Sequence, residues 1–347
     1  MRSIRPLCLP RDSCPPLLQG TGRAAVLGRF AVALALGLAA LVPATGAEMV
    51  LAVARSPHSL PIHVAEAQGY FAAEGVQVRT RDCVSGQRCI QELLDGQAQL
   101  ATVADLPIVF HSFERADYAV LATLMTSVRD AKVVARKSSG IGTAAHLAGK
   151  RVATPKGSSA HFFLDAYLLI NGVDPALVTV VSLPPEQLAD ALERRQVDAV
   201  AVFEPWAWRA VQAVGADALV LPGSRTYTTT FNLVADRHTI AARDDELVRV
   251  LRAVERAERF IREQPGVAQS IMISRLQLDR SFVGWAWKDF DYRLGLDQSL
   301  ISTLENEARW ALREGHVKAG KPVPNYLDFL HPVPLRKAVP GAVTIVR

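Results

Sequence analysis

Short apolar runs alternate along most of the chain with longer stretches whose apolar residues recur every three or four positions. The short runs predict buried strands, and the longer stretches predict amphipathic helices that pack on them. Strands are expected at 49–54, 76–81, 100–103, 118–126, 131–136, 150–153, 178–182, 199–203, 219–221 and 231–235. Helices are expected at 62–74, 87–94, 160–170, 186–195, 246–263 and 299–313, among others. This alternation indicates an α/β fold with parallel strands.

The first 47 residues differ from this pattern. Two arginines precede an uninterrupted apolar run at 31–42, and small residues follow it. A positive flank, a short apolar segment and a small-residue exit are the parts of a secretory signal peptide. The run is too short to cross a bilayer, which needs about 20 apolar residues. We therefore expect residues 1–47 to be a signal peptide cleaved after Ala47, or alternatively after Ala44, and the mature protein to be periplasmic.

Cleavage at this point changes the charge balance and the cysteine count. The whole chain carries 39 basic and 34 acidic residues, but five arginines and one aspartate lie in residues 1–47, which leaves 34 basic and 33 acidic residues and a net charge of +1. The strongly basic field typical of nucleic-acid binding is then absent, and no nucleic-acid partner is expected. Only Cys83 and Cys89 remain, and an oxidising compartment favours a disulfide between them over two free thiols.

Five short motifs follow one another along the mature chain. They are Glu66-x-x-Gly69-Tyr70-Phe71-x-x-x-Gly75, Ser85-Gly86 before a helix ending in Asp95-Gly96, Leu147-x-Gly149-Lys150-x-Val152-Ala153-x-Pro155-x-Gly157-Ser158-Ser159, Asp198-Ala199-x-x-x-x-Glu204-Pro205-Trp206, and Pro324-x-Tyr326-Leu327. Their order and spacing resemble those of the nitrate/sulfonate/taurine family of periplasmic substrate-binding proteins of ABC transporters. The resemblance covers nearly all of residues 48–330.

The resemblance implies the type II periplasmic binding protein fold, in which two α/β lobes hold the ligand in a cleft between them. Chain crossings near Lys137 and Ala235 would divide the mature chain into lobe I, residues 48–137 and 236–347, and lobe II, residues 138–235. The resemblance also implies a monomer without a cofactor that delivers a small anionic ligand to an ABC permease and ATPase in the inner membrane. An aliphatic sulfonate or taurine is the first expectation for the ligand and nitrate the second, while a carboxylate or a pyrimidine stays open.

Two turns between a strand and a helix are candidate ligand-binding segments. In an open α/β sheet, ligands lie beyond the carboxyl ends of the strands, where helix N-termini offer unpaired N–H groups and a partial positive charge to an anion. Glycine lets a ligand approach the backbone, and serine adds a hydroxyl donor. The alternative is that the serines only cap their own helices. The candidates are Ser85 and Gly86 in the first turn, and Gly157, Ser158, Ser159 and His161 in the second.

Four further residues are candidates because each follows a predicted strand. Glu204 is positioned to accept hydrogen bonds from an amine or hydroxyl of the ligand, and an ion pair with a lysine or arginine near the hinge is the alternative. Trp206 would form a wall of the pocket or pack between helix and sheet. Asp105 would contact the ligand or cap the next helix. Ser127 would contact the ligand or belong to an ordinary loop.

Motifs of the common enzyme classes are absent from the sequence. There is no P-loop, Rossmann glycine fingerprint, His-Glu-x-x-His pair or nucleophile elbow, and no His and Cys spacing typical of zinc sites. Together with these absences, the resemblance implies solute binding without catalysis. The alternative is an enzyme on the same fold, similar to the thiamine-pyrimidine synthases or to menaquinone-pathway enzymes, because a fold does not determine chemistry. Delivery of the ligand to a sensor kinase also stays open.

Overall fold

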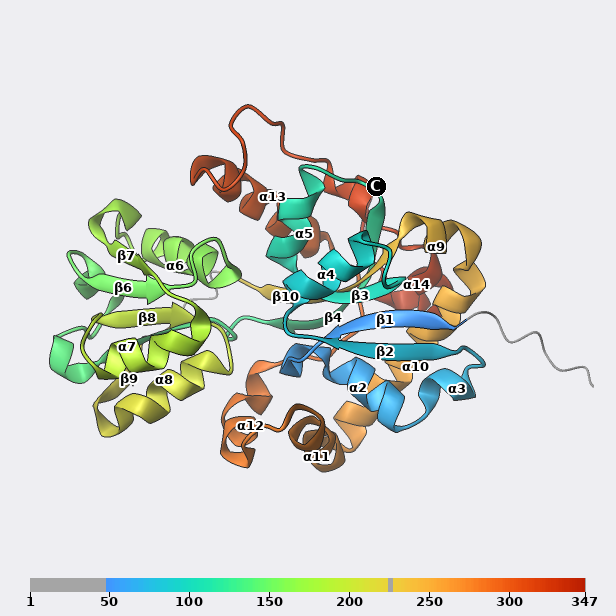
Figure 1. Ribbon diagram of the computed structural model, residues 1–347, viewed down its shortest axis with the longest axis horizontal. Helices are drawn as coiled ribbons and strands as arrows, with labels where there is room; N and C mark the ends of the chain where they lie inside the picture. The colour runs from blue at the N-terminus through green and yellow to red at the C-terminus, as the bar shows by residue number, and fades with distance from the viewer. Residues whose placement is uncertain (1–47, 224–226, 347) are drawn as a thin grey trace, which may run out of the picture. The chain divides into compact units, whose positions relative to one another are not determined.

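The computed structural model describes residues 48–223 and 227–346, and the expected signal peptide lies outside the described residues. The described strands form two five-stranded sheets (Figure 1). The first sheet has the order β2-β1-β3-β10-β4, with β1 (Met49–Ala54), β2 (Val78–Cys83), β3 (Leu100–Ala104), β4 (Tyr118–Ser127) and β10 (Thr229–Asp236). The second has the order β7-β6-β8-β5-β9, with β5 (Lys132–Arg136), β6 (Arg151–Thr154), β7 (Thr179–Ser182), β8 (Ala199–Val202) and β9 (Ala218–Val220).

Both chain crossings lie earlier than the sequence predicted. β5 pairs with β8 and β9 in the second sheet, and β10 pairs with β3 and β4 in the first. The crossings are therefore the segments between β4 and β5 and between β9 and β10, not those near Lys137 and Ala235. From here on, lobe I is residues 48–127 and 229–346, and lobe II is residues 132–220. The expected boundaries were wrong because hydrophobic periodicity reports that a strand is buried, not which sheet it joins.

Each sheet combines parallel and antiparallel strands, which corrects the expectation of parallel strands alone. β1 is parallel to β2 and β3, and β6 is parallel to β7 and β8. β5 runs antiparallel to β8, with Lys132 opposite Val202. The chain thus enters the second sheet at the edge where β8 ends. Its first strand in that sheet, β5, therefore runs away from this edge, in the direction opposite to β8. β10 enters the first sheet in the same way, with Thr229 opposite Ser127 at the end of β4.

The helices of lobe I pack around the first sheet. One predicted helix at 62–74 is divided in two, because Gly69 adopts a left-handed φ of 66° between α2 and α3. The proline-rich tail after Val317 includes α14 and the fully buried Tyr326. The helices are α2 (Leu60–Ala67), α3 (Tyr70–Ala73), α4 (Gly86–Leu94), α5 (Asp105–Ser112), α9 (Arg237–Ala242), α10 (Asp244–Glu263), α11 (Pro265–Leu276), α12 (Arg280–Ala286), α13 (Gln298–Arg313) and α14 (Val333–Ala338).

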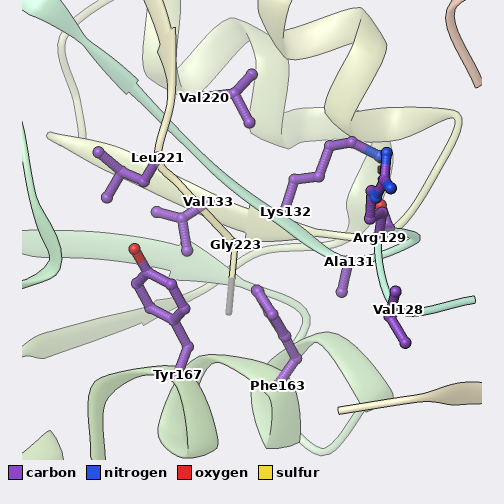
Figure 2. A pocket seen from close by; sticks show the side chains of 10 residues that line it. All are labelled: Val128, Arg129, Ala131, Lys132, Val133, Phe163, Tyr167, Val220, Leu221 and Gly223. Carbon is purple, nitrogen blue, oxygen red and sulfur yellow. Dashed lines mark hydrogen bonds between the residues drawn. The ribbon is translucent and has the colours of Figure 1, made fainter. Parts of the chain in front are cut away.

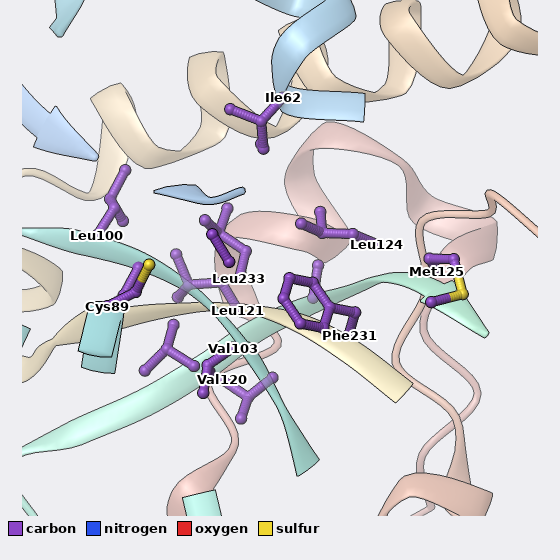
Figure 3. Packing of buried hydrophobic residues seen from close by; sticks show 14 of the residues in the cluster. Ile62, Cys89, Leu100, Val103, Val120, Leu121, Leu124, Met125, Phe231 and Leu233 are labelled. Atoms are coloured by element: carbon purple, nitrogen blue, oxygen red, sulfur yellow. The ribbon is translucent and has the colours of Figure 1, made fainter. Parts of the chain in front are cut away.

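The core of lobe I forms on the first sheet, where Leu121, Phe231 and Leu233 are buried (Figure 3). Cys83 and Cys89 belong to this core as free, buried thiols, so the disulfide expected between them is not formed. Free cysteine behaves as a small apolar residue in such packing. Burial, together with a hydrogen bond that the Cys89 thiol donates to Cys83, raises the pKa of Cys89 far above its usual value.

Lobe II has helices on both faces of the second sheet, and each face has its own core. Val152 of β6 faces the cluster that contains Leu164 of α6 (Ser159–Ile170). The next residue, Ala153, faces the cluster that contains Leu188 of α7 (Leu188–Glu193) and Ala207 of α8 (Trp206–Val214). No helix among the described residues is long and apolar enough to span a membrane.

Candidate functional site

The turn from β6 into α6 carries most of the predicted ligand contacts. Gly157 has a left-handed φ of 75°, which explains the glycine at this position. Ser158 is the N-cap residue of α6, but its side chain makes no capping hydrogen bond, and its Oγ is buried without a partner. Thr154, the last residue of β6, is fully buried, and its Oγ1 also lacks a partner. Because buried hydroxyls are normally hydrogen-bonded, two hydroxyls without a described partner, one at the end of β6 and one at the N-cap of α6, are consistent with a bound polar group.

The Gly157 amide, in contrast, is not available to a ligand. Its N–H donates to Nδ1 of the buried His161, with 3.3 Å between the two nitrogens. Burial lowers the pKa of His161, which favours the neutral ring that this hydrogen bond requires. His161 therefore holds the turn in place rather than contacting a ligand. The amide of Ser158 donates to a backbone carbonyl. Within the described part of the chain, the N–H groups of this helix start that lack a partner are those of Ser159 and Ala160.

Asp105 is fully buried and connects the two lobes. α5 begins at Asp105, and Ala104 rather than Asp105 is its N-cap residue. The Oδ1 atom of Asp105 accepts hydrogen bonds from Tyr227 Oη at 2.7 Å and from Ser159 Oγ at 3.4 Å, and Oδ2 accepts one from Thr230 N at 2.9 Å. The Ser159 hydroxyl predicted for a ligand anion is thus bonded to a carboxylate of the protein itself.

A second buried carboxyl group, Glu307 of α13, belongs to the same cluster. The Tyr227 hydroxyl lies 3.2 Å from Oε1 of Glu307, and Oε2 has no partner. Burial raises the pKa of Asp105, although hydrogen bonds from Thr230 and Tyr227 oppose the shift. Burial and the charge of Asp105 raise the pKa of Glu307 well above its usual value. Glu307 is therefore the group that retains a proton, and Asp105, which accepts more hydrogen bonds, is the ionised partner.

The lobe I turn combines a helix cap with a close backbone contact. Ser85 is exposed and caps α4, accepting a hydrogen bond from Arg88 N at 3.3 Å. A Cβ atom on Gly86 would lie 3.1 Å from the Cα of Val103, so glycine allows the start of α4 to approach β3. The N–H groups of Gly86 and Gln87 have no partner among the described residues. They remain available to a ligand.

The Glu204 carboxylate is hydrogen-bonded within the protein. The ion pair with a lysine, which was the alternative prediction for this residue, is formed. The Oε1 atom of Glu204 accepts hydrogen bonds from Trp285 Nε1 at 2.8 Å and from Lys132 Nζ at 2.9 Å, and Oε2 accepts one from Trp208 N at 3.0 Å. Lys132 Nζ also lies 3.1 Å from Asp289 Oδ2. Burial opposes the charge of Lys132, but the two carboxylates outweigh burial and raise its pKa. Because Trp285 and Asp289 belong to lobe I, this network joins the lobes.

Ser127 and Trp206 have structural roles. Ser127 Oγ donates to the backbone carbonyl of Asp289 at 2.6 Å and accepts a hydrogen bond from Arg129 N at 3.1 Å. The Arg209 guanidinium lies 4.5 Å from the ring centroid of Trp206, which packs against the core of lobe II. Both side chains therefore take part in internal hydrogen bonding or packing, and their contact with a ligand stays a prediction.

A cavity of about 240 Å³ lies beside the first crossing (Figure 2). Its walls come from the crossing, from the start of β5, from α6 and from the end of β9, and they include Arg129, Lys132, Phe163, Tyr167 and Leu221. Lys132 pairs with the last residue of β8, so the cavity lies at the edge where the parallel strands of lobe II end. Sequence reasoning missed all of its lining residues, because apolar residues of α6 and β9 carry no signal beyond burial.

Comparisons with known proteins agree with the two-lobed fold. A family model described as NMT1/THI5 like matches residues 56–268. The taurine-binding periplasmic protein of Escherichia coli is 30% identical over 173 residues, which is 50% of this chain and 52% of that protein. The periplasmic aliphatic sulfonate binding protein SsuA of Escherichia coli superimposes with a TM-score of 0.74 at 17% identity, covering 82% of this chain and 97% of that one. The desulfurization enzyme DSZB also has this fold, with a TM-score of 0.66 at 15% identity, covering 85% and 99% of the two chains.

Proposed function

We propose that this chain, which belongs to the NMT1/THI5-like family, is the periplasmic solute-binding component of an ABC importer for a small organic anion. The observation that carries the proposal is the pairing of two α/β lobes through two crossings, with unpaired N–H groups at a helix start in each lobe. Such groups bind anions, and a cationic side chain nearby adds to this attraction. The names of the related proteins support an aliphatic sulfonate or taurine as the first ligand to test. Nitrate is the second ligand that we propose to test.

We propose binding without catalysis, although an enzyme shares the fold. Two of the predicted site residues with carboxyl groups, Asp105 and Glu204, are occupied, since each accepts several hydrogen bonds from the protein. Cys83 and Cys89 are buried thiols in the core of lobe I. Incubation with a bound sulfonate, followed by mass spectrometry of the small molecule, should return the ligand unchanged. A turnover product would favour the enzyme alternative.

Ligand binding is tested by thermal unfolding of the exported protein with sulfonates, including taurine, and with small carboxylates and nitrate. A ligand at one hundred times its dissociation constant should stabilise the folded state by about 2.7 kcal/mol. If no sulfonate, carboxylate or nitrate shifts the transition at millimolar concentration, the proposal is wrong.

The periplasmic location and the ABC transporter partners belong to the same proposal. Protein recovered from the periplasm should have an intact mass that begins at Glu48 or Thr45 and should be a monomer by light scattering. Cells that express the permease and ATPase should lose uptake of the ligand when this chain is deleted. A full-length N-terminus in the periplasm would contradict the expected cleavage, and unchanged uptake would contradict the role in import.

A further inference from the structure

The cavity beside the first crossing indicates which class of anion the protein accepts. We propose that this cavity holds the apolar body of the ligand, and that the ligand is an aromatic monoanion with a single ring, of which an arylsulfonate is the type. The inference rests on the proposed function and narrows its ligand. It starts from the position of the cavity at the carboxyl edge of the parallel strands of lobe II, where ligands of open α/β sheets lie.

Apart from Arg129 and Lys132, the walls of the cavity are mainly apolar. Val133, Phe163 and Leu221 are almost fully buried and line it together with the ring of Tyr167 (Figure 2). The Tyr167 hydroxyl donates to the carbonyl of Pro222 at 3.1 Å, so it is not available to a ligand. Water in a space with such walls would lose hydrogen bonds, which makes its replacement by an apolar group favourable.

The volume sets the size of the group. An apolar cavity of about 150 Å³ accommodates benzene. A cavity of about 240 Å³ therefore has room for one substituted ring, whereas three fused rings would exceed it. The rings of Phe163 and Tyr167, whose centroids are 5.7 Å apart, offer an aromatic wall to such a group.

Arg129 supplies the charge at the rim, and Lys132 does not. The three donors of the Lys132 ammonium are matched by three acceptors, Glu204 at 2.9 Å, Asp289 at 3.1 Å and the carbonyl of Arg129 at 2.5 Å. The Arg129 guanidinium makes one contact of 3.5 Å with Asp289, and its side chain is 61% exposed. Its other N–H groups have no protein partner in the described structure. A planar guanidinium with free donors suits the paired oxygens of a sulfonate or carboxylate.

Small hydrophilic ligands fit this site less well than an arylsulfonate. Nitrate or methanesulfonate would reach Arg129 and leave the apolar space unfilled. The ammonium group of taurine would be placed against apolar walls, and burial of an unpaired charge is costly. The aromatic ring, in contrast, removes apolar surface from water on both sides of the contact.

Calorimetry on the exported protein tests the inference with methanesulfonate, taurine, benzenesulfonate and anthracenesulfonate. Benzenesulfonate should bind at least ~10-fold more tightly than methanesulfonate, as expected for burial of one ring, and anthracenesulfonate should bind more weakly than benzenesulfonate. This comparison of ligand sizes uses only the wild-type protein, so it does not depend on whether a variant folds. Equal affinity for the one-ring and three-ring ligands, or no preference for benzenesulfonate over methanesulfonate, would overturn the inference and leave the proposed function standing. A failure of every sulfonate to bind would count against the proposed function itself.

Two variants locate the site. Ala131→Phe places a ring in the cavity and should weaken benzenesulfonate binding ~10-fold or more, with methanesulfonate binding retained. Arg129→Gln should weaken both ligands ~10-fold, because it removes a charge-assisted contact. Ala145→Phe and Arg194→Gln, at exposed positions of lobe II, are the matched controls and should change neither affinity. Tight benzenesulfonate binding that Ala131→Phe leaves unchanged would show that the ring is bound elsewhere.

Discussion

His63 is expected to make the stability of this protein depend on pH across the mildly acidic range. The residue lies on α2, is 1% exposed, and has no hydrogen-bond partner for either ring nitrogen. Burial, helped by the positive charge of Arg275, lowers the pKa of His63 from 6.5 to about 4. The folded state therefore holds the ring neutral at pH values where the unfolded chain binds a proton.

The sign and size of the effect follow from this shift. As the pH falls from 6.5 to 4, the unfolded state gains a proton that the folded state does not, so the free energy of unfolding decreases. A difference of two and a half pKa units corresponds to about 3 kcal/mol in the free energy of unfolding. Most of this contribution is lost by pH 4. The contribution is complete above pH 6.5, and the loss levels off below pH 4.

The substitution His63→Leu isolates this contribution. Leucine has a comparable size and no ring nitrogens, so the variant should be at least as stable as the wild type at pH 7. Urea unfolding of both proteins from pH 7.5 to 4 should show a difference in stability that grows by about 3 kcal/mol toward low pH. His238→Leu, at an exposed position, is the control and should leave the pH profile unchanged. Parallel pH profiles for the wild type and His63→Leu would refute the reasoning.

Three other substitutions or reactions test the remaining contacts. Glu204→Ala removes an acceptor shared by Lys132, Trp285 and Trp208, so urea unfolding should show a loss of about 3 kcal/mol; a change of ligand preference without loss of stability would contradict this. Ser158→Ala should keep the melting temperature, since its Oγ has no protein partner, and weaken sulfonate binding ~10-fold in calorimetry; unchanged affinity would remove Ser158 from the site. Thiol titration should find two reactive thiols after unfolding without reductant, and the same thiols should react slowly in the native protein. Finding no free thiol after unfolding would show that the disulfide is formed.

The strands and long helices could be predicted from periodicity because burial alone determines that pattern. Helix α10, predicted at 246–263, begins only two residues earlier, and β3 and β4 each end one residue later than predicted. The sheets that β5 and β10 join could not be predicted in this way. Both strands are buried along most of their length, and burial alone does not tell which sheet they join.

The candidate site was predicted in part. Ser158 was placed correctly at a helix start, but the bond from Gly157 N to His161 was missed, although a spacing of four residues across a helix start could have signalled it. The partners of Asp105 and Glu204 lie far away in the sequence, at Tyr227 and Lys132. No local pattern encodes such long-range contacts, so composition and spacing identified the acids but not what neutralises them.

The position of β10 has a consequence for the order in which the chain folds. β10 lies between β3 and β4, so the first sheet is incomplete until residue 236 has emerged from the ribosome or the membrane. All strands of the second sheet lie within residues 132–220, and they can pair while the central position of the first sheet is still vacant. Lobe II is therefore able to fold first, on a segment of continuous sequence, whereas β4 must wait for a partner made about a hundred residues later, at the entropic cost of closing that long loop. During this interval the exposed edges of β3 and β4 are the part of the nascent chain most in need of a chaperone.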